Sequence, residues 1–425
     1  MEQTTTHATT PLPVVPCANG AHGANGLEVP ARVVRLATLA QIQPWIGQWN
    51  AMARGVPFRR WEWLESWWRQ YGPGPAEQHK SRELFVLAAF DAGQTLVGLA
   101  PWYVERSASQ GRIVRFLGSG EVCSEYLSMM CVDGKEEFVA RNLARWLTES
   151  AKSERTKVES NGTPNGQPSD GWDVLKLSAV ANDDMAISRL LVHLGGQGNA
   201  VYRRPAMNCW RLALPASWDD YLAMVSKSHR KQLRRLDRDF FRSGRACIHW
   251  VREPDQLEHA LSVLIALHQR RWKHLGWPGC FASERFLAFH REVALRLLAF
   301  DALRMSWLEI DGRAVAAEYH LAGDGIVYAY QSGIAPDALD YQPGHLSHLA
   351  TIRRAIERGD RAFDFLRGDE PYKSHWRAVP RATFEARVVP PRIGPRIRQG
   401  IWAAGSSVIH QLRSGWQLTK HLITE

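Results

Sequence analysis

"LRMSWLEIDGRAVAAEYHLA", residues 303–322, consists of two apolar stretches on either side of Asp311-Gly312, a dipeptide typical of a tight hairpin turn. A third apolar stretch, "GIVYAYQSG" (325–333), follows and ends in small residues. "GHLSHLATIRRAIERG" (344–359) then has apolar residues at helical spacing, and "RAFDFLRG" (361–368) is a further apolar stretch. The order predicts strand, strand, strand, helix and strand, which is an α/β unit.

The first half of the chain has the same order of elements. "ELFVLAAFDAGQTLVGLAPWYVE" (83–105) predicts a hairpin that turns at 91–93, and "RIVRFLGSG" (112–120) predicts the third strand. "EEFVARNLARWLTES" (136–150) predicts an amphipathic helix, and "WDVLKLSAV" (172–180) the strand after it. The repetition indicates two duplicated α/β units with mixed central sheets flanked by helices. The alternative is that the elements alternate in this way without duplication.

Composition suggests where these units begin and end. Residues 1–28 are rich in Thr, Pro, Ala and Gly and predict a disordered tail. We expect a first unit over 29–215, with a flexible insertion at 152–171, and a second unit over 216–390. A helical stretch at 218–244 joins them, and 391–425 is a basic amphipathic C-terminal tail.

The net charge of +10 in 425 residues is concentrated in two segments. Ser226–Arg245 contains eight Lys and Arg against two Asp, and Arg392–Glu425 contains five against one Glu, so the remainder is close to neutral. A uniformly basic nucleic-acid coat is therefore excluded. The first segment fits an amphipathic linker helix better than a nucleic-acid contact. The second either docks on protein or lies at an anionic membrane surface.

The cysteines and the apolar runs indicate the compartment. The six cysteines form no CxxC pair and no zinc or disulfide pattern, which suits a reducing cytoplasm, and we expect no metal site. The N-terminus has no apolar signal segment, and no run of 18 apolar residues occurs. We expect a cytoplasmic protein, and the C-terminal tail leaves open a peripheral contact at the inner face of the membrane.

"FDFLRGDEPYKSHW" (363–376) places charged groups among aromatic residues directly after a predicted strand. Together with "LHQRRWKHLG" (267–276) and "DYQPGHLSHLATIRRAIERG" (340–359), it resembles the GNAT-type acyltransferase domain of the CelD family. That family is associated with bacterial exopolysaccharide or cellulose production and is related to the Fem peptidyltransferases, whose chains carry two GNAT-like domains. The resemblance covers roughly residues 31–390. It implies an acyl-CoA donor, such as acetyl-CoA, and a small-molecule or glycan-precursor acceptor.

The segment before the second predicted helix is the candidate donor loop. Pro343 and Gly344 open that helix, so its free N–H groups and positive dipole end would face an anion. The resemblance implies that Tyr341, Gln342, Gly344 and His345 contact the acyl-CoA. The usual GNAT signature is Gln/Arg-x-x-Gly-x-Gly/Ala, whereas here only Gln342 and Gly344 stand near it, with no second glycine. A helix start without a ligand is the alternative.

Proton transfer needs a base, and Glu318 is the first candidate because it lies among apolar residues of a predicted strand. Desolvation there would raise its pKa toward neutrality. Strand alternation places Glu318 and His320 on one face and Tyr319 on the other. A solvent-exposed edge glutamate is the alternative. His268 is a second candidate base, although its helical register with Leu264 and Trp272 favours a core histidine.

The resemblance also implies a role for Lys373, because Fem-type relatives carry a lysine after an aromatic residue just beyond the last strand. Tyr372-Lys373 stands at that place, and an ammonium there can neutralise an oxyanion. Asp369 and Glu370 would orient Lys373 or the acceptor. A salt-bridged turn is the alternative. The first unit has no such motif, so we expect it to act as a scaffold or to help hold the acceptor through Glu125 and Tyr126.

These residues predict direct acyl transfer from acyl-CoA to an amine or hydroxyl, since no nucleophilic Ser or Cys motif is present. Two other readings stay open. One is Fem-like transfer from aminoacyl-tRNA, with tRNA as the nucleic-acid partner. The other is a catalytically degenerate assembly subunit of a polysaccharide system.

Overall fold

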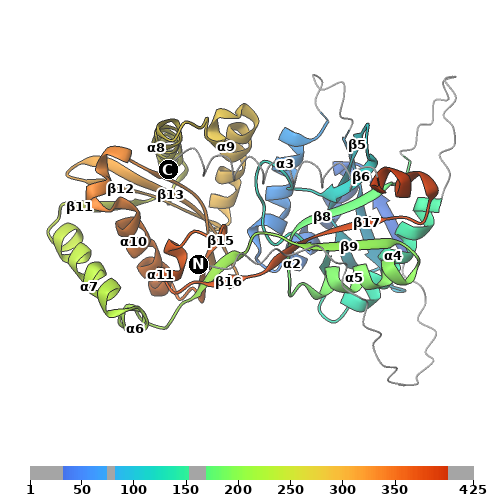
Figure 1. Ribbon diagram of the computed structural model, residues 1–425, viewed down its shortest axis with the longest axis horizontal. Helices are drawn as coiled ribbons and strands as arrows, with labels where there is room; N and C mark the ends of the chain where they lie inside the picture. The colour runs from blue at the N-terminus through green and yellow to red at the C-terminus, as the bar shows by residue number, and fades with distance from the viewer. Residues whose placement is uncertain (1–31, 74–81, 153–168, 401–425) are drawn as a thin grey trace, which may run out of the picture.

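The computed structural model describes residues 32–73, 82–152 and 169–400. The predicted N-terminal tail, most of the 152–171 insertion and residues 401–425 lie outside the described residues. Two α/β units lie side by side, the first on the right of Figure 1 and the second on the left. Within the described ranges, no helix has both the length and the apolar character needed to cross a membrane.

The second unit contains a seven-stranded mixed sheet in the order β11-β12-β13-β14-β15-β10-β16. Neighbouring strands are antiparallel except β14 and β15, which run parallel. The predicted hairpin at Asp311-Gly312 is confirmed as the β12–β13 connection. The strands are β10 Cys209–Ala213, β11 Ala246–Trp250, β12 Leu303–Ile310, β13 Arg313–Gly323, β14 Ile326–Ile334, β15 Ala362–Arg367 and β16 Val379–Arg381.

Helices cover both faces of this sheet (Figure 1). Adjacent residues of β13 identify the faces: Tyr319 packs on His290 of α9, whereas Glu318 accepts a hydrogen bond from Ser347 of α10. The helices are α8 Pro254–His274, α9 Glu284–Ala299, α10 Pro343–Glu357 and the short α11 Tyr372–His375, with 3-10 turns at Cys280–Ala282 and Pro336–Tyr341. The predicted helix at 344–359 is therefore confirmed as α10.

The first unit contains a six-stranded sheet, β2-β5-β6-β8-β17-β9, and a four-stranded sheet, β1-β3-β4-β7. The two strands of its predicted hairpin break at Phe85 and Pro101, so each contributes to both sheets. Proline cannot donate to a ladder, which explains the second break. The strands are β1 Arg32–Leu36, β2 Arg82–Leu84, β3 Val86–Phe90, β4 Leu96–Ala100, β5 Trp102–Ser107, β6 Gly111–Phe116, β7 Met130–Cys131, β8 Val174–Ala181, β9 Ala200–Pro205 and β17 Thr383–Val389.

The helices of the first unit supply much of its aromatic core. They are α1 Leu39–Ile42, α2 Ile46–Met52, α3 Trp61–Tyr71, α4 Glu136–Lys152 and α5 Met185–Gly196, with 3-10 turns at Gln43–Trp45 and Pro57–Arg59. Trp49 of α2 and Trp63 and Trp67 of α3 are each at most 1% exposed, as are Trp102 of β5 and Trp172 just before β8. Many tryptophans of this chain therefore serve as core volume.

The two sheets exchange strands. β10 lies within the predicted first unit in sequence but joins the sheet of the second unit, between β15 and β16. β17 lies within the predicted second unit but joins the six-stranded sheet of the first unit, between β8 and β9 (Figure 1). The predicted boundary at 215/216 is therefore wrong for these two strands, since each completes the sheet of the other unit. Neither sheet is complete without both halves of the chain.

The basic stretch at 218–244 is not one helix, which corrects the prediction. α6 (Trp218–Met224) ends at Val225, whose backbone is extended, and Ser226 caps α7 (Lys227–Leu236) by accepting a hydrogen bond from the His229 amide. Serine is a preferred N-cap, so it starts a new helix here. A π-helical turn, Asp237–Arg242, follows.

The units also meet directly through α3 and α9, which lie next to each other at the centre of Figure 1. Arg296 of α9 donates to Glu65 of α3 at 2.6 Å. Close to this interface, the backbone of Gly323 on β13 lies so near Gly55 of the first unit that a Cβ at 323 would overlap the Gly55 carbonyl oxygen.

Gly323→Ala should therefore lower the free energy of unfolding by about 2–3 kcal/mol, because backbone of one unit must move away from the other. Thermal unfolding of the full chain measures the effect. Gly47→Ala in α2 is the control, since nothing lies within 4 Å of its Cβ position. Alanine there should be neutral or stabilising by about 0.5–1 kcal/mol. Equal melting temperatures for the two variants would contradict the close approach.

Candidate active site

β14 and β15 hydrogen-bond as parallel neighbours over only three residue pairs and then separate. The pairs are Ile326–Ala362, Val327–Phe363 and Tyr328–Asp364. β14 continues to Ile334 and β15 to Arg367 without further pairing to each other among the described residues. α10 begins shortly after β14, so the predicted donor loop lies beside this opening.

The donor loop has a well-defined backbone. Gln342 adopts a left-handed conformation, φ 55° and ψ 51°, and its carbonyl accepts hydrogen bonds from the His345 and Leu346 amides. Its side-chain oxygen accepts from Gln232 of α7 at 2.6 Å. Tyr341 is 42% exposed. A Cβ at Gly344 would meet Ile334 of β14 at 3.1 Å, so a larger residue would press on the strand opening.

His345 is neutral at pH 7. Burial, together with the nearby His348, His229 and His375, lowers the pKa of His345 to about 4. The start of α10 therefore offers the positive end of its dipole, the Gly344 amide and a neutral imidazole to an anion, since Pro343 has no N–H and the His345 and Leu346 amides donate to Gln342. Among the predicted donor-binding residues, none supplies a full positive charge.

Lys373 is buried, and oxygen atoms of its own turn surround its ammonium. Its side chain is 2% exposed, and Nζ lies 3.2, 2.9 and 2.9 Å from the carbonyl oxygens of Leu366, Arg367 and Gly368. The Glu370 carboxylate lies 2.9 Å from the same nitrogen. An ammonium has three protons to donate, so these oxygens use its full capacity. Lys373 thus ties α11 to the end of β15.

Asp369 and Tyr372 lie at the mouth of the same strand. Asp369 is exposed and accepts hydrogen bonds from Trp210 at 2.9 Å and Asn208 at 3.1 Å, which lower its pKa. Tyr372 is 40% exposed and packs near His348, with ring centroids 5.8 Å apart. Burial of its hydroxyl, with the nearby carboxylates, raises the pKa of Tyr372, so it remains a proton donor at pH 7.

Glu318 is buried beneath α10, on the same face as His320 as predicted. It accepts hydrogen bonds from Ser347 at 2.7 Å and His320 at 3.1 Å. Burial by itself would raise the pKa of Glu318, but these hydrogen bonds and the nearby His348 lower it overall. The prediction of a raised pKa was therefore wrong: His320 on the same strand lowers the pKa most, and His348 and Ser347 of α10 add to its effect.

His268 lies on the opposite face of the sheet from Glu318. Its ring packs on Phe281, which contacts His290, and His290 packs on Tyr319. His268 is 3% exposed, contacts Gln269 and Cys280, and has a pKa that burial lowers. The structure therefore groups Glu318, Tyr372, Lys373 and Asp369 around β15 and α10, and separates His268 from them.

A charged network at the junction of the two units uses residues of the stretch 363–376. Asp364, which is fully buried, accepts hydrogen bonds from the Tyr126 hydroxyl of the first unit at 2.6 Å and from Arg211 at 2.7 Å. Arg367 forms an ion pair with Glu125 of the first unit. The sequence analysis had suggested Glu125 and Tyr126 as contacts of the acceptor substrate. It missed Arg211, because the Asp364 carboxylate that Arg211 contacts is 153 residues away in the sequence.

Glu125 differs from an ordinary carboxylate. Burial raises its pKa to about 7, against the opposing effect of Arg367. It also lines a cavity of about 270 Å³ between the units, together with Arg367, Cys123 and Met207. A carboxylate with a pKa near 7 next to a cavity is a suitable general base.

The raised pKa predicts a pH dependence of stability. Between about pH 4.5 and 7 the unfolded chain has lost the Glu125 proton while the folded protein keeps it, so the free energy of unfolding falls as pH rises, by roughly 3 kcal/mol. The Glu125→Gln variant should lack this decrease in the free energy of unfolding. Thermal unfolding at pH 5, 6, 7 and 8 measures it, with the exposed Glu121→Gln as control. An unchanged profile in Glu125→Gln would contradict the assignment.

The comparisons with known proteins agree with this geometry. Residues 227–374 match the sequence model described as "Acetyltransferase (GNAT) domain", so the chain contains a GNAT acetyltransferase domain. That match covers strands β11 to β15, helix α10 and the donor loop, and it ends within α11.

The fold of one solved structure matches most of the chain. The crystal structure of FemX has a TM-score of 0.54 at 10% identity and covers 80% of this chain and 95% of its own. A tandem GNAT protein from the clavulanic acid biosynthesis pathway has a TM-score of 0.40 at 12% identity and covers 84% and 98%. No curated protein sequence matches the chain. The GNAT part of the sequence resemblance is confirmed, while the CelD part stays a prediction.

Proposed function

We propose that the protein is an acyltransferase that moves an acyl group from acyl-CoA, with acetyl-CoA as the simplest donor, to an amine or hydroxyl. The observation that carries the proposal is the opening between β14 and β15 beside the start of α10, within the matched GNAT domain. The pantetheine arm of CoA is narrow and carries amides, so it suits a gap between two strand edges. The α10 N-terminus is placed to meet its pyrophosphate.

The reaction would proceed by direct attack. The acceptor nitrogen or oxygen forms a bond to the thioester carbonyl carbon and loses its proton to a base. The resulting oxyanion collapses, the carbon–sulfur bond breaks, and the CoA thiolate leaves. Tyr372, a phenol at neutral pH, is the proposed proton donor to that thiolate.

Other predicted residues receive supporting roles in this proposal. Lys373 fixes the end of β15, and Glu318 holds Ser347 and His320 under α10. Asp369 ties the strand mouth to Trp210. The acceptor is proposed to be a cell-envelope or exopolysaccharide precursor, as the CelD resemblance implies.

A thermal-shift panel tests the donor class. Acetyl-CoA and longer acyl-CoAs at micromolar concentrations should stabilise the full chain, because a ligand that binds only the folded state raises its melting temperature. If no acyl-CoA raises the melting temperature, and tRNA binds with an affinity that falls steeply with salt, the result would instead support Fem-like transfer from aminoacyl-tRNA. The structure offers a tRNA less positive charge at α7 than the sequence suggests, because Asp237 forms ion pairs with Arg242 and Arg353.

A further inference from the structure

The two units have the same strand opening but carry different charges where it begins. In the first unit, β6 and β8 pair in parallel over three residue pairs and then separate, as β14 and β15 do in the second. The last pair before the opening is Tyr328–Asp364 in the second unit, whereas it is Arg115–Lys176 in the first. Paired residues on adjacent strands lie on one face, so two cations stand together at the first opening.

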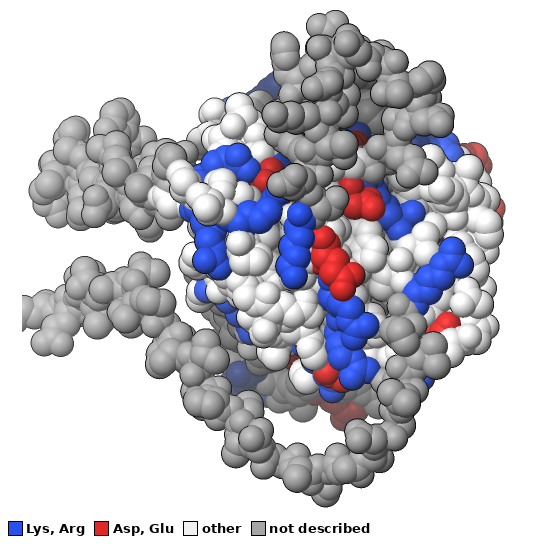
Figure 2. Space-filling view, turned by 90° about the vertical axis from the view of Figure 1, so that its right-hand side faces the viewer, with Lys and Arg blue, Asp and Glu red and all other residues white. Residues whose placement is uncertain are grey.

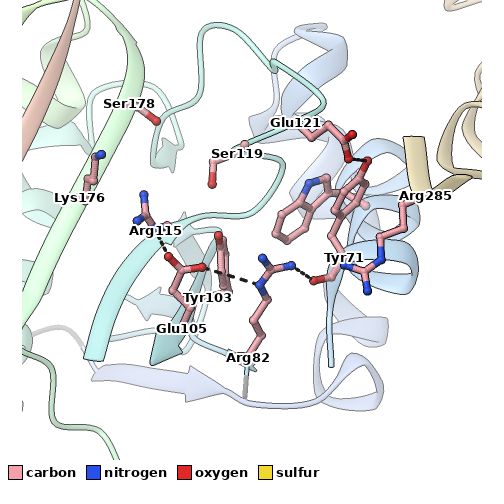
Figure 3. Close-up of a pocket in the computed structure, with 12 residues that line it drawn as sticks. Tyr71, Arg82, Tyr103, Glu105, Arg115, Ser119, Glu121, Lys176, Ser178 and Arg285 are labelled. Atoms are coloured by element: carbon pink, nitrogen blue, oxygen red, sulfur yellow. Dashed lines mark hydrogen bonds and ion pairs between the residues drawn. The ribbon is translucent and has the colours of Figure 1, made fainter. Parts of the chain in front are cut away.

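A cavity of about 410 Å³ lies over this cationic pair. Figure 3 shows Arg115 and Lys176 on its β-sheet side, Arg82 below them, and Arg285 reaching in from α9 of the second unit. Four basic side chains line the cavity, against the two carboxylates of Glu105 and Glu121.

The carboxylates nearby do not match the cations one to one. Glu105 lies 2.6 Å from Arg115 and 3.8 Å from Arg82, so one carboxylate serves two guanidinium groups. Lys176 lies 3.5 Å from Glu385, which also pairs with Arg204 at 2.9 Å. The cavity wall therefore keeps a positive excess, which favours an anionic ligand. On the outer face of this unit, most visible charged side chains are likewise Lys and Arg (Figure 2).

Aromatic rings form another wall of the same cavity. Trp67 stacks on Tyr71, with centroids 5.6 Å apart, and packs on Tyr103 at 5.0 Å. The Tyr71 hydroxyl donates to Glu121 at 2.7 Å. These rings are almost fully buried, so they form a rigid wall behind the cations. Fixed cations next to hydroxyl groups suit a sugar that carries an acidic group.

The cavity adjoins the junction that contains Glu125. The 270 Å³ cavity at that junction shares Ser119, Gly120 and Ser178 with the larger one. A ligand anchored at Arg115 and Lys176 would thus extend toward Glu125 and Arg367, between the two units.

We propose that the opening of β6 and β8 in the first unit is the acceptor site, and that the acceptor is an anionic sugar whose acidic group binds Arg115 and Lys176. This inference deepens the acyltransferase proposal and rests on it for the role of the ligand. Glu125, at the far end, is placed to take the proton from the attacking amine or hydroxyl.

Calorimetric titration of the full chain without any acyl-CoA tests the site. Glucosamine 6-phosphate, glucuronate and neutral glucose are the probes. We expect binding of at least one anionic probe and none of glucose; a response to the phosphate or to the carboxylate identifies the acidic group. Arg115→Gln and Lys176→Met should each weaken that binding about tenfold or more. Arg106→Gln, an exposed cation on β5, should leave it unchanged.

Inorganic phosphate should compete with a bound sugar phosphate in the wild-type protein. This competition tests whether cations bind the acidic group even if a variant fails to fold. Acyl-CoA binding by the folded variants should equal that of the wild type. If no anionic probe binds, or if both cavity variants bind as the wild type does, the site assignment is overturned. If the probes bind as expected but acyl-CoA does not, the acyltransferase proposal fails and the anionic site stands.

Discussion

Asp364→Ala should lower the free energy of unfolding by about 3–5 kcal/mol, because it removes one partner of a buried ion pair. The Asp364 carboxylate accepts from Arg211, from the Tyr126 hydroxyl and from the Leu366 amide, and its side chain is 0% exposed. The substitution leaves these donors without an acceptor at the contact between the units. Thermal unfolding of the full chain measures the loss.

Asp183→Ala is the matched control, since the Asp183 side chain is 66% exposed and pairs with Arg381 at the surface. It should cost about 0–1 kcal/mol. Because β10 and β17 complete each other's sheets, we expect one cooperative transition in every case. A loss for Asp364→Ala no larger than that of the control would contradict the junction network.

Lys373→Met should reduce turnover by about two orders of magnitude or more and should also destabilise the protein by about 2–3 kcal/mol. Methionine keeps the length of the side chain but cannot donate to the carbonyls of Leu366, Arg367 and Gly368. The end of β15 would then move, and with it Tyr372. Thermal unfolding and initial rates on the same preparation separate the two effects.

Glu370→Gln is the control for this prediction, because the Glu370 side chain is 55% exposed and is only one of four oxygen neighbours of Nζ. It should change stability by less than about 1 kcal/mol. A Lys373→Met protein with full stability and no turnover would contradict the positioning role. It would favour the direct charge stabilisation that the sequence resemblance had implied.

Local patterns were sufficient to predict the repeated strands and helix of each unit. The hairpin at Asp311-Gly312, the helix at 344–359 and the strand at 361–368 were each confirmed, because turn residues and apolar periodicity act within a few residues. The broken basic helix was missed, although Ser226 is a recognisable N-cap signal.

Long-range pairing could not be predicted in the same way. β10 and β17 are ordinary short strands in sequence, and nothing within them specifies that each joins the sheet of the other unit. The same limit applies to the site. Lys373 was predicted from its neighbours in sequence, but backbone carbonyls, which no sequence displays, hold its ammonium. Glu318 likewise receives one of its two hydrogen bonds from α10, through Ser347.

Calorimetric titration of acetyl-CoA into the full chain tests the central claim most directly, namely that the opening between β14 and β15 binds an acyl-CoA donor. We predict saturable binding in the micromolar range. Gly344→Val should weaken it about tenfold or more, since a side chain there presses on Ile334 at the opening. Absence of acetyl-CoA binding, or equal binding by Gly344→Val, would contradict the assignment of the donor site.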